Sequence, residues 1–423
     1  MRKICLTLVG IYLLMLHAFS QSVEKDSSTY GSKPLRVDEV NLVSSYYTQN
    51  GDHSAITGGT GTERVVDLAN GLDIKWVGID KSQRKHSLTA TLGIDHHSSA
   101  SSAFVNKSGA SKTGGTRVYP SIDWTVENAR RGTGFELGSY YSEEYNYKSF
   151  GLDAGLTKKT TNNGEFNVKL TGYFDKVKQI LPSELIPVDT VRSTSGTVYI
   201  TTASGRVVAL NSGGGIAAGK RPSIPSKPRT TLTSSFSFSQ VINERLQGII
   251  LLDVVYQQGD LGLPFHRVYW NDGSVHEENL PAQRLKLPVG VRVNYFLGDR
   301  IVLRSYYRYY IDDWGLKAHT ASLEVPVKIT PFFSVVPFYR FYSQTAAKYF
   351  APFEAHTAKD PYYTSNYAYA AFNSHFFGAG IRIAPPKGIV GMKNFSLIEI
   401  RYGHYTQNVD LSSDVISMNL KFK

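Results

Sequence analysis

The sequence predicts an all-β protein: a transmembrane antiparallel up-and-down β-barrel of about 16 strands, of the outer-membrane type. Three observations support this fold class. The chain lacks long apolar stretches, its apolar and polar residues alternate in short blocks, and every second connection between blocks is short. Each block is close to the ten residues expected of a tilted membrane strand. An extended chain in lipid can pair all its backbone N–H and C=O groups only in a closed sheet, which is why alternation and closure are expected together.

The composition excludes two other classes of protein. The chain has 423 residues, with 27 Tyr, 21 Phe and 37 Gly but only one Cys and four Met. Its mean hydropathy of −0.22 does not fit a helical membrane protein, which needs stretches of about 18 or more apolar residues. Abundant aromatic and β-branched residues also argue against disorder.

Residues 1–20 have the pattern of a Sec signal peptide. Arg2 and Lys3 precede an apolar run over residues 4–19, and the small residues Ala18 and Ser20 mark a cleavage site. A retained N-terminal anchor is the alternative. Cleavage takes the formal charge from +11 to +9 and removes Cys5, which excludes disulfides, thiolate catalysis and cysteine metal sites. We expect residues 21–37 to form a periplasmic segment and residues 38–423 to form the barrel.

The clearest strand signals lie in the C-terminal half. Between Leu285 and Tyr295 every odd-numbered residue is apolar or aromatic, and a second alternating block follows over residues 301–312. The C-terminus alternates again over residues 416–423. The short connections are residues 81–85, 127–133, 160–165, 243–246, 297–300, 329–332 and 385–394; the long ones are 49–64, 98–115, 180–228, 258–283 and 344–369.

This asymmetry between short turns and long loops is typical of outer-membrane barrels. An even number of strands places both termini on the periplasmic side. A β-propeller or solenoid would repeat at a fixed period, which this sequence does not show. Aromatic residues such as Tyr309, Tyr310, Trp314, Tyr339 and Tyr402 are candidates for the girdles at the membrane interfaces.

Sixteen strands leave an aqueous lumen unless loops fill it. The lumen-lining candidates are polar residues on the inward phase of the C-terminal strands: Lys286, Arg292, Arg304, Arg308, Glu324, Lys328, Arg340, Arg382, Glu399 and Arg401. Eight are cationic and two are anionic, which predicts a positive potential that favours anionic solutes. The alternative is charge pairing along an inert wall, with Glu324 and Glu399 bridging neighbouring strands.

Residues 46–63 form a glycine-rich motif, YYTQNGDHSAITGGTGTE. Glycines permit tight turns and close approach of a partner. The motif is not a phosphate loop, because no Lys-Ser/Thr and no helix follow it. The motif residues of interest are Gly51, Asp52, His53, Gly58, Gly59, Gly61 and Glu63.

This motif resembles the signature of domain of unknown function family 3570, found largely in Bacteroidota. The resemblance extends over nearly the whole mature chain, including its Lys-Phe-Lys ending. It implies an exported β-rich protein, without an established activity or catalytic residues to transfer, and it hints at a redox-linked envelope system. One departure is His96-His97 after Asp95, where the resemblance predicts small residues.

Two loop regions suggest further roles. Asp52 and His53 in the first long loop and His96 at a strand end carry metal-binding groups, although neighbouring histidines on a strand point to opposite faces. Solvated residues at the loop mouth are the alternative, and the sequence predicts no metal and no cofactor. Within the long loop 180–228, residues 197–200 and 206–210 alternate around a turn and predict a hairpin, which constricts the lumen, meets a partner or forms a surface flap.

The leading functional hypothesis is therefore an outer-membrane pore or transport channel for small polar or anionic solutes, with loops gating the lumen. The alternative is a non-conducting barrel that acts as a scaffold or partner in an envelope complex, including a redox-linked one. A barrel-embedded hydrolase is a remote alternative suggested only by His319 near Ser322; the sequence otherwise contains no catalytic motif, and we expect no enzyme. Expected partners are outer-membrane lipid, the barrel-assembly machinery, a small solute and other envelope proteins, but no nucleic acid.

Overall fold

A computed structural model describes residues 32–98, 114–181, 185 and 224–423, together with the backbone of three short strands between residues 197 and 218. The expected signal peptide and most of the segment 21–37 lie outside these residues. The first strand begins at Lys33, earlier than residue 38. Among the described residues, no helix has the length and apolar character needed to cross a membrane.

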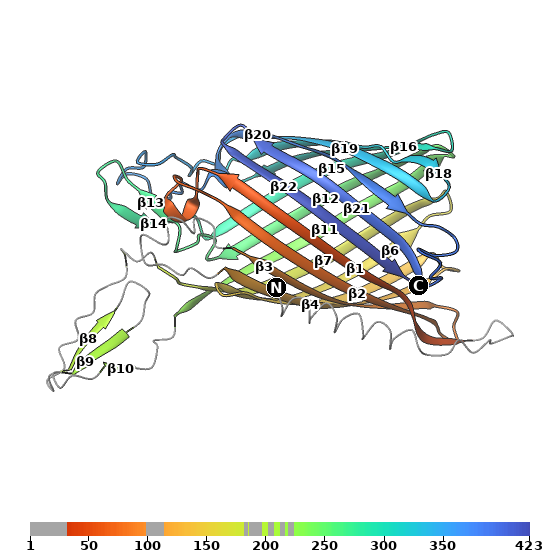
Figure 1. Ribbon diagram of the computed structural model, residues 1–423, viewed down its shortest axis with the longest axis horizontal. Helices are drawn as coiled ribbons and strands as arrows, with labels where there is room; N and C mark the ends of the chain where they lie inside the picture. The colour runs from red at the N-terminus through yellow and green to blue at the C-terminus, as the bar shows by residue number, and fades with distance from the viewer. Residues whose placement is uncertain are drawn as a thin grey trace.

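The described chain forms a closed antiparallel β-barrel of sixteen strand positions (Figure 1). The barrel closes because β1 pairs with β22, from Val40 opposite Phe422 to Gly51 opposite Leu411. The wall strands are β1 (Lys33–Gly51), β2 (Val65–Ile79), β3 (Lys85–His97), β4 (Gly115–Asn128), β5 (Thr133–Glu143), β6 (Tyr147–Lys159), β7 (Gly164–Lys178), β11 (Ser226–Asn243), β12 (Leu246–Gly259), β15 (Gln283–Leu297), β16 (Ile301–Asp312), β17 (Lys317–Glu324), β18 (Val327–Thr330), β19 (Phe333–Gln344), β20 (Phe372–Ile383), β21 (Phe395–Gln407) and β22 (Leu411–Phe422).

Two of these strands share one position in the wall. Both β17 and β18 lie between β16 and β19, so the seventeen strands of the sheet occupy sixteen positions. The break at Val325 and Pro326 is expected, because proline cannot donate a hydrogen bond to a neighbouring strand.

The two ends of the barrel differ as predicted. Short turns join the strands at one end, called here the short-turn end, where β1 begins and β22 ends. The longer loops lie at the other end, called here the mouth (Figure 1). The elements outside the wall are η1 (Ala55–Thr57), β8 (Thr197–Thr201), β9 (Val207–Asn211), β10 (Ile216–Ala218), β13 (Arg267–Tyr269), β14 (Val275–Glu277) and η3 (Tyr367–Tyr369). Pairing of β8 with β9 confirms the hairpin predicted in the longest loop.

The inner face of the wall is identified by contacts between strands that are not neighbours. Arg401 Nη2 on β21 lies 2.6 Å from Glu324 Oε2 on β17, although β19 and β20 separate these strands. Only side chains on the concave side of a curved sheet can converge in this way. Because residues opposite each other in the register share a face, this contact assigns the inward phase to every strand in turn.

The outward phase is apolar, as a lipid-facing surface requires. Its members include large side chains that are exposed on the isolated chain, among them Leu137, Leu152, Leu170 and Ile250. Two predicted girdle residues do not belong to this surface. Tyr310 lies on the inward phase opposite Pro288, and Trp314 is buried at the mouth with 2% of its surface exposed.

Candidate functional site: the lumen wall and the mouth

The register places all ten lumen-lining candidates on the inward phase of β15–β21. We call these residues the basic wall. Six of them line one cavity of about 390 Å³ near the short-turn end: Arg304, Glu324, Lys328, Arg382, Glu399 and Arg401. The cavity also contains Lys421, whose Nζ lies 2.8 Å from Glu39. Tertiary structure thus gathers side chains from β16, β17, β18, β20 and β21 at one place.

The two carboxylates of the basic wall pair with only part of its positive charge. Glu324 bridges Arg304 at 2.8 Å and Arg401 at 2.6 Å, and Arg401 also lies 3.5 Å from Glu399. Among the described residues, no carboxylate lies within 4.0 Å of the other cationic members, which are Lys286, Arg292, Arg308, Lys328, Arg340 and Arg382. The predicted bridging role of Glu324 is present, yet the wall keeps a surplus of positive charge.

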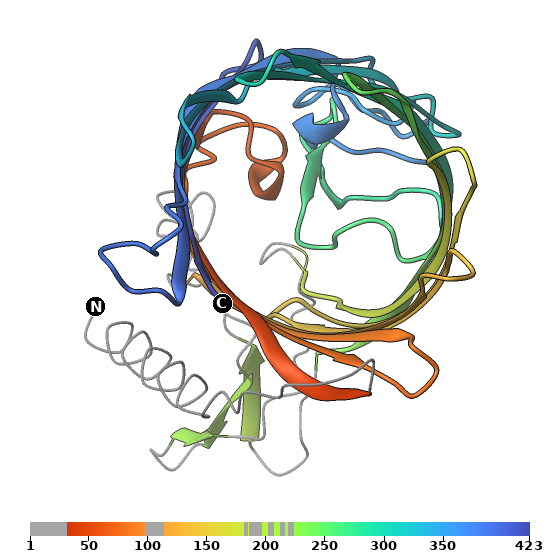
Figure 2. The same cartoon turned by 90° about the vertical axis from the view of Figure 1, so that its right-hand side faces the viewer.

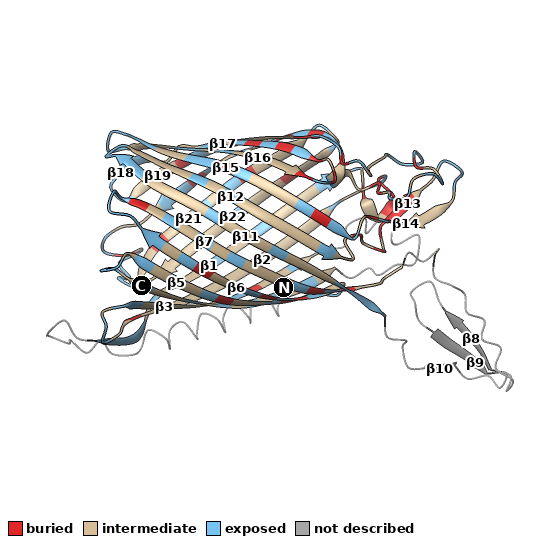
Figure 3. Cartoon of the chain, turned by 180° about the vertical axis from the view of Figure 1, so that it is seen from behind, coloured by how far each residue is buried: buried red, intermediate tan, exposed pale blue. Residues whose placement is uncertain are grey.

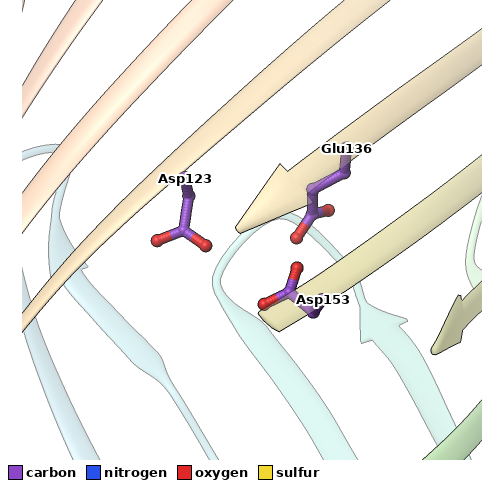
Figure 4. A group of neighbouring side chains, drawn as sticks. All are labelled: Asp123, Glu136 and Asp153. Carbon is purple, nitrogen blue, oxygen red and sulfur yellow. The ribbon is translucent and has the colours of Figure 1, made fainter. Parts of the chain in front are cut away.

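A second charged cluster, absent from the sequence prediction, lies on β4–β6. The carboxylate atoms of Asp123, Glu136 and Asp153 come within 4.8 Å of one another on three neighbouring strands (Figure 4). Lys169 on β7 lies 2.6 Å from Glu136 and 3.2 Å from Asp153. One ammonium therefore offsets part of the charge of three carboxylates. We call this cluster the acidic wall. The cluster was not predicted, although the alternation in β4, with Asp123 between Ile122 and Trp124, was a signal that could have placed Asp123 on the inward phase.

The acidic wall and the basic wall lie about half a turn of the barrel apart, because β5 and β6 are eight positions from β19 and β20. A ring of sixteen tilted strands has a backbone diameter of roughly 30 Å. The Debye length at physiological salt is about 8 Å, so each wall acts on solutes largely by itself. The predicted positive potential is therefore a property of the basic wall and does not extend around the whole lumen.

Three loops pack together at the mouth: residues 52–64, 260–282 and 345–371. Viewed along the barrel, they lie within the ring of strands (Figure 2). The His53 ring stacks on Tyr367 with centroids 3.7 Å apart, and Arg267 Nη1 donates a hydrogen bond to the Ile56 carbonyl at 2.7 Å. The peptide N–H of Asn279 donates to the Tyr363 carbonyl at 3.1 Å. We call these three loops the mouth cluster.

The glycine-rich motif supplies the first of these loops. Gly58, Gly59 and Gly61 have φ angles of 78°, 82° and 78°, in the left-handed region that favours glycine. A Cβ at Gly58 would collide with the Tyr269 ring, and one at Gly59 would collide with the Ser365 backbone. The motif therefore folds tightly and also allows the other two loops to approach. Gly51 accepts a hydrogen bond from the Glu63 N–H at 2.7 Å, which closes the loop at its base.

The metal candidates Asp52, His53 and His96 do not come together. His96 lies on the outward phase opposite Leu68, and its Nδ1 lies 2.9 Å from Thr116 Oγ1. His53 lies inside the mouth cluster, with Nδ1 3.1 Å from the Gly59 carbonyl oxygen. Asp52 is exposed. The strand geometry separates these groups, because His96 and the first loop lie on opposite sides of the wall.

Buried residues occur at β13 in the mouth (Figure 3). The buried polar centre of the mouth cluster is Glu278, which follows β14. Glu278 accepts hydrogen bonds from the Leu263 N–H at 2.8 Å and from Thr364 Oγ1 at 2.5 Å, and His266 Nδ1 lies 3.4 Å away. Burial alone would raise the pKa of the Glu278 carboxyl. The contacts with His266, Thr364 and Leu263 outweigh burial, so the pKa of Glu278 is lowered. Elsewhere in the cluster, burial raises the pKa of Glu63.

An aromatic anchor joins the mouth cluster to the wall. Arg284 pairs with Asp312, and its guanidinium lies 4.3 Å from the centroid of the Trp314 ring. Trp314 Nε1 donates to the Gln283 carbonyl at 3.0 Å. Tyr369, at the end of η3, lies 5.8 Å from Trp314 between ring centroids. The loop 345–371 is thus held against β15 and β16.

The residues behind the hydrolase alternative lie on opposite faces of β17. His319 is on the outward phase, where its Nδ1 lies 2.7 Å from Tyr307 Oη. Ser322 is on the inward phase opposite Tyr306. The two side chains therefore do not form a nucleophile–base pair.

Comparisons with known proteins give the following likenesses. The barrel is similar to a structure described as a bacterial polysaccharide outer membrane secretin, at 9% identity and a TM-score of 0.42, over 91% of this chain and 98% of that one. It is similar to a BenF-like porin from Pseudomonas fluorescens Pf-5, at 8% identity and a TM-score of 0.41, over 91% and 98%. It is also similar to OccK1 (OpdK) of Pseudomonas aeruginosa, at 6% identity and a TM-score of 0.38, over 91% and 97%.

In sequence, no curated protein matches this chain. A family model described as "Protein of unknown function (DUF3570)" matches residues 90–413.

Proposed function

The chain belongs to the DUF3570 family of proteins of unknown function, and we propose that it is an outer-membrane channel for small polar or anionic solutes, with loops that gate the lumen. The proposal includes export through the Sec pathway, insertion by the barrel-assembly machinery and contact with outer-membrane lipid. One observation carries it: the sixteen-position wall is apolar on its outward phase and charged on its inward phase. A barrel of this size encloses an aqueous lumen unless loops fill it.

The surplus of unpaired cations on the basic wall supports the preference for anions. Guanidinium and ammonium groups held on a low-dielectric wall raise the local concentration of anions. The carboxylates of the acidic wall raise the local concentration of cations in the same way. Whether anions or cations are preferred therefore depends on which wall lies closer to the permeating solute.

The mouth cluster supports a restricted entrance. Its loops lie within the ring of strands and are held by buried contacts such as those of Glu278 and Trp314. Loops that are held in place by buried contacts also favour the second candidate function, a non-conducting barrel that presents its loops to other envelope proteins. The two candidates differ in whether the lumen is open.

Single-channel recording in a planar bilayer tests this difference directly. The purified protein is first checked for heat-modifiable migration on a gel, which establishes that the barrel is folded. We expect discrete conductance steps that grow with salt concentration and a reversal potential that indicates anion selectivity. A folded barrel that stays silent in the bilayer would overturn the channel proposal in favour of the scaffold.

A further inference from the structure

Three arginines of the basic wall lie over the faces of aromatic rings. The guanidinium carbon of Arg292 is 5.6 Å from the centroid of Tyr306, that of Arg340 is 4.9 Å from Phe376, and that of Arg401 is 4.9 Å from Phe338. All six side chains are on the inward phase. The rings were not part of the sequence prediction, which considered only the charged residues.

Glycines make room for two of these rings. Gly378, Gly380 and Gly403 are inward-facing positions of β20 and β21, and none of them has a positive φ, so no left-handed backbone conformation requires glycine there. A Cβ at Gly403 would lie 2.5 Å from Cζ of Phe376 and 3.3 Å from Cζ of Phe338. A Cβ at Gly378 would collide with the Tyr402 carbonyl oxygen and would also lie 2.8 Å from Cζ of Phe338. A Cβ at Gly380 would lie 2.9 Å from Cγ of Arg401.

The absence of Cβ atoms at these glycines thus leaves space for the two rings and for the aliphatic part of the Arg401 side chain. Phe338 and Phe376 lie side by side above these glycines, with ring centroids 5.2 Å apart. The guanidinium of Arg340 lies over the Phe376 ring, and that of Arg401 lies over the Phe338 ring. The arrangement holds two guanidinium groups at defined positions on the wall.

A ring face positions a guanidinium without neutralising it. A cation–π contact uses the face of the guanidinium, so its edge N–H groups can still bind a ligand unless another side chain occupies them. Arg340 uses none of them on a carboxylate within 4.0 Å among the described residues. A planar fork of N–H donors matches the two oxygens of a carboxylate.

The surroundings of these arginines are partly apolar. Two adjoining cavities, of about 390 Å³ and about 320 Å³, share Glu324 and Arg401. The first contains the apolar side chains Val302, Pro326, Val336 and Leu397 together with Lys328 and Arg382, and the second contains Phe338, Phe376 and Arg340. Cavities of this size accommodate a small organic molecule, with apolar surface beside its charged groups.

We propose that these paired cavities form a saturable binding station for small organic carboxylates on the lumen wall. The carboxylate binds to the guanidinium fork of Arg340, and the carbon skeleton lies against the apolar lining. Arg401, whose guanidinium is paired with Glu324 and Glu399, adds positive charge beside this fork. Lys328 and Arg382 increase the local positive potential towards the short-turn end. The inference deepens the proposed channel function. It rests on that function only for the role of the site in transport, because binding itself does not require an open lumen.

The test uses benzoate as the probe and two assays on the full-length folded barrel. Equilibrium dialysis of labelled benzoate against the barrel in detergent measures binding, and benzoate added to chloride solutions in the bilayer measures partial block of the conductance. We expect saturable binding and block with the wild-type protein. Benzamide, which has the same shape without the charge, should do neither.

Three variants assign the effect to the stacked arginines. Arg340→Gln should weaken benzoate binding about tenfold, because a charged bidentate contact is lost. Phe338→Leu combined with Phe376→Leu should weaken it about threefold to tenfold while leaving the charge unchanged. Phe377→Leu is the matched control, because Phe377 lies on the outward phase of β20, next to Phe376. This variant should bind benzoate as the wild type does.

The outcomes separate this inference from the channel proposal. A conducting barrel that shows no saturable benzoate binding, or binding that is equal in the wild type and in Arg340→Gln, would overturn the binding station alone. A silent barrel that binds benzoate saturably and loses it in Arg340→Gln would overturn the channel and keep the station. Should the double phenylalanine variant fail the heat-modifiability check, Arg340→Gln decides the question, because Arg340 holds no ion pair in the described part of the chain.

Discussion

The mouth cluster and the basic wall are both rich in charged side chains, but the two regions differ in how far those charges are buried. In the mouth, Glu278 is buried and accepts hydrogen bonds from the Leu263 N–H and from Thr364 Oγ1. On the wall, the Arg304 side chain is 53% exposed and shares Glu324 with Arg401. Buried charges need complete pairing, whereas exposed ion pairs contribute only about 0–1 kcal/mol. The mouth charges therefore hold loops in place, and the wall charges remain available to solutes.

A substitution at the buried centre of the mouth cluster should give the largest effect on stability. Glu278→Ala leaves His266 and Thr364 without their buried partner, so we expect a local cost of about 3 kcal/mol in the mouth cluster. The wall strands do not depend on this contact, and heat-modifiable migration should persist. Limited digestion with chymotrypsin measures the change, as faster cleavage in loops 260–282 and 345–371. Lys359→Ala, an exposed position in loop 345–371 of the same cluster, is the control.

The pKa of Glu278 predicts acid sensitivity of the same region. Because this pKa is lowered in the folded state, its contribution to stability is complete above the ordinary carboxyl pKa of about 4.3 and is lost as the pH falls through the lowered value. Glu63 has the opposite sign: its pKa is raised, so stability increases as the pH falls through that value. Pepsin, which is active in acid, should cut the wild-type mouth faster at low pH. Glu278→Gln should reduce this pH dependence, and an unchanged profile would contradict the role of Glu278.

Changing the walls should give a smaller effect, on selectivity and not on folding. Arg304→Ala combined with Arg308→Ala should lower the anion-to-cation permeability ratio about twofold to threefold, because two positive charges leave the basic wall. Asp123→Asn combined with Asp153→Asn should raise the ratio by a similar factor. Reversal potentials under a salt gradient measure both. If neither pair changes the ratio in a conducting barrel, the walls do not face the permeation path.

The smallest effect is expected outside the barrel. His319→Leu replaces an outward-facing imidazole, bound to Tyr307, with an apolar side chain suited to lipid. We expect a change in the free energy of unfolding within about 0.5 kcal/mol and an unchanged conductance. Urea unfolding in lipid vesicles measures the first quantity. A loss of ester hydrolysis in this variant, relative to a hydrolysing wild type, would revive the hydrolase alternative.

Much of the fold was predictable because it depends on local pattern. The alternation over residues 285–295 predicts the inward phase of β15, and the pairing of Gly290 with Arg308 and of Arg292 with Tyr306 is consistent with it. The hairpin of β8 and β9 was predictable from alternation around a turn. The division of one wall strand into β17 and β18 was not predicted, although Pro326 was a signal for it.

The site was predictable only in part. The phase of each arginine follows from strand periodicity, so the ten charged candidates share one face. Their partners do not follow from periodicity. Phe338 lies two strands from Arg401, and Trp314, which resembles an interface residue in the sequence, is buried under a loop. The acidic wall is also a product of strand order, because Asp123, Glu136 and Asp153 meet only when β4, β5 and β6 lie in register.

The sequence by itself therefore determined the period-two alternation, the asymmetry between turns and loops and the face on which each charge lies, because these properties depend on residues close together in the chain. Only the tertiary structure decided which charges meet. Closure of the sheet brings Glu324 to Arg401 across three strand pairings, and the packing of three loops buries Glu278 and stacks His53 on Tyr367. Such contacts depend on register and curvature, which are properties of the whole barrel.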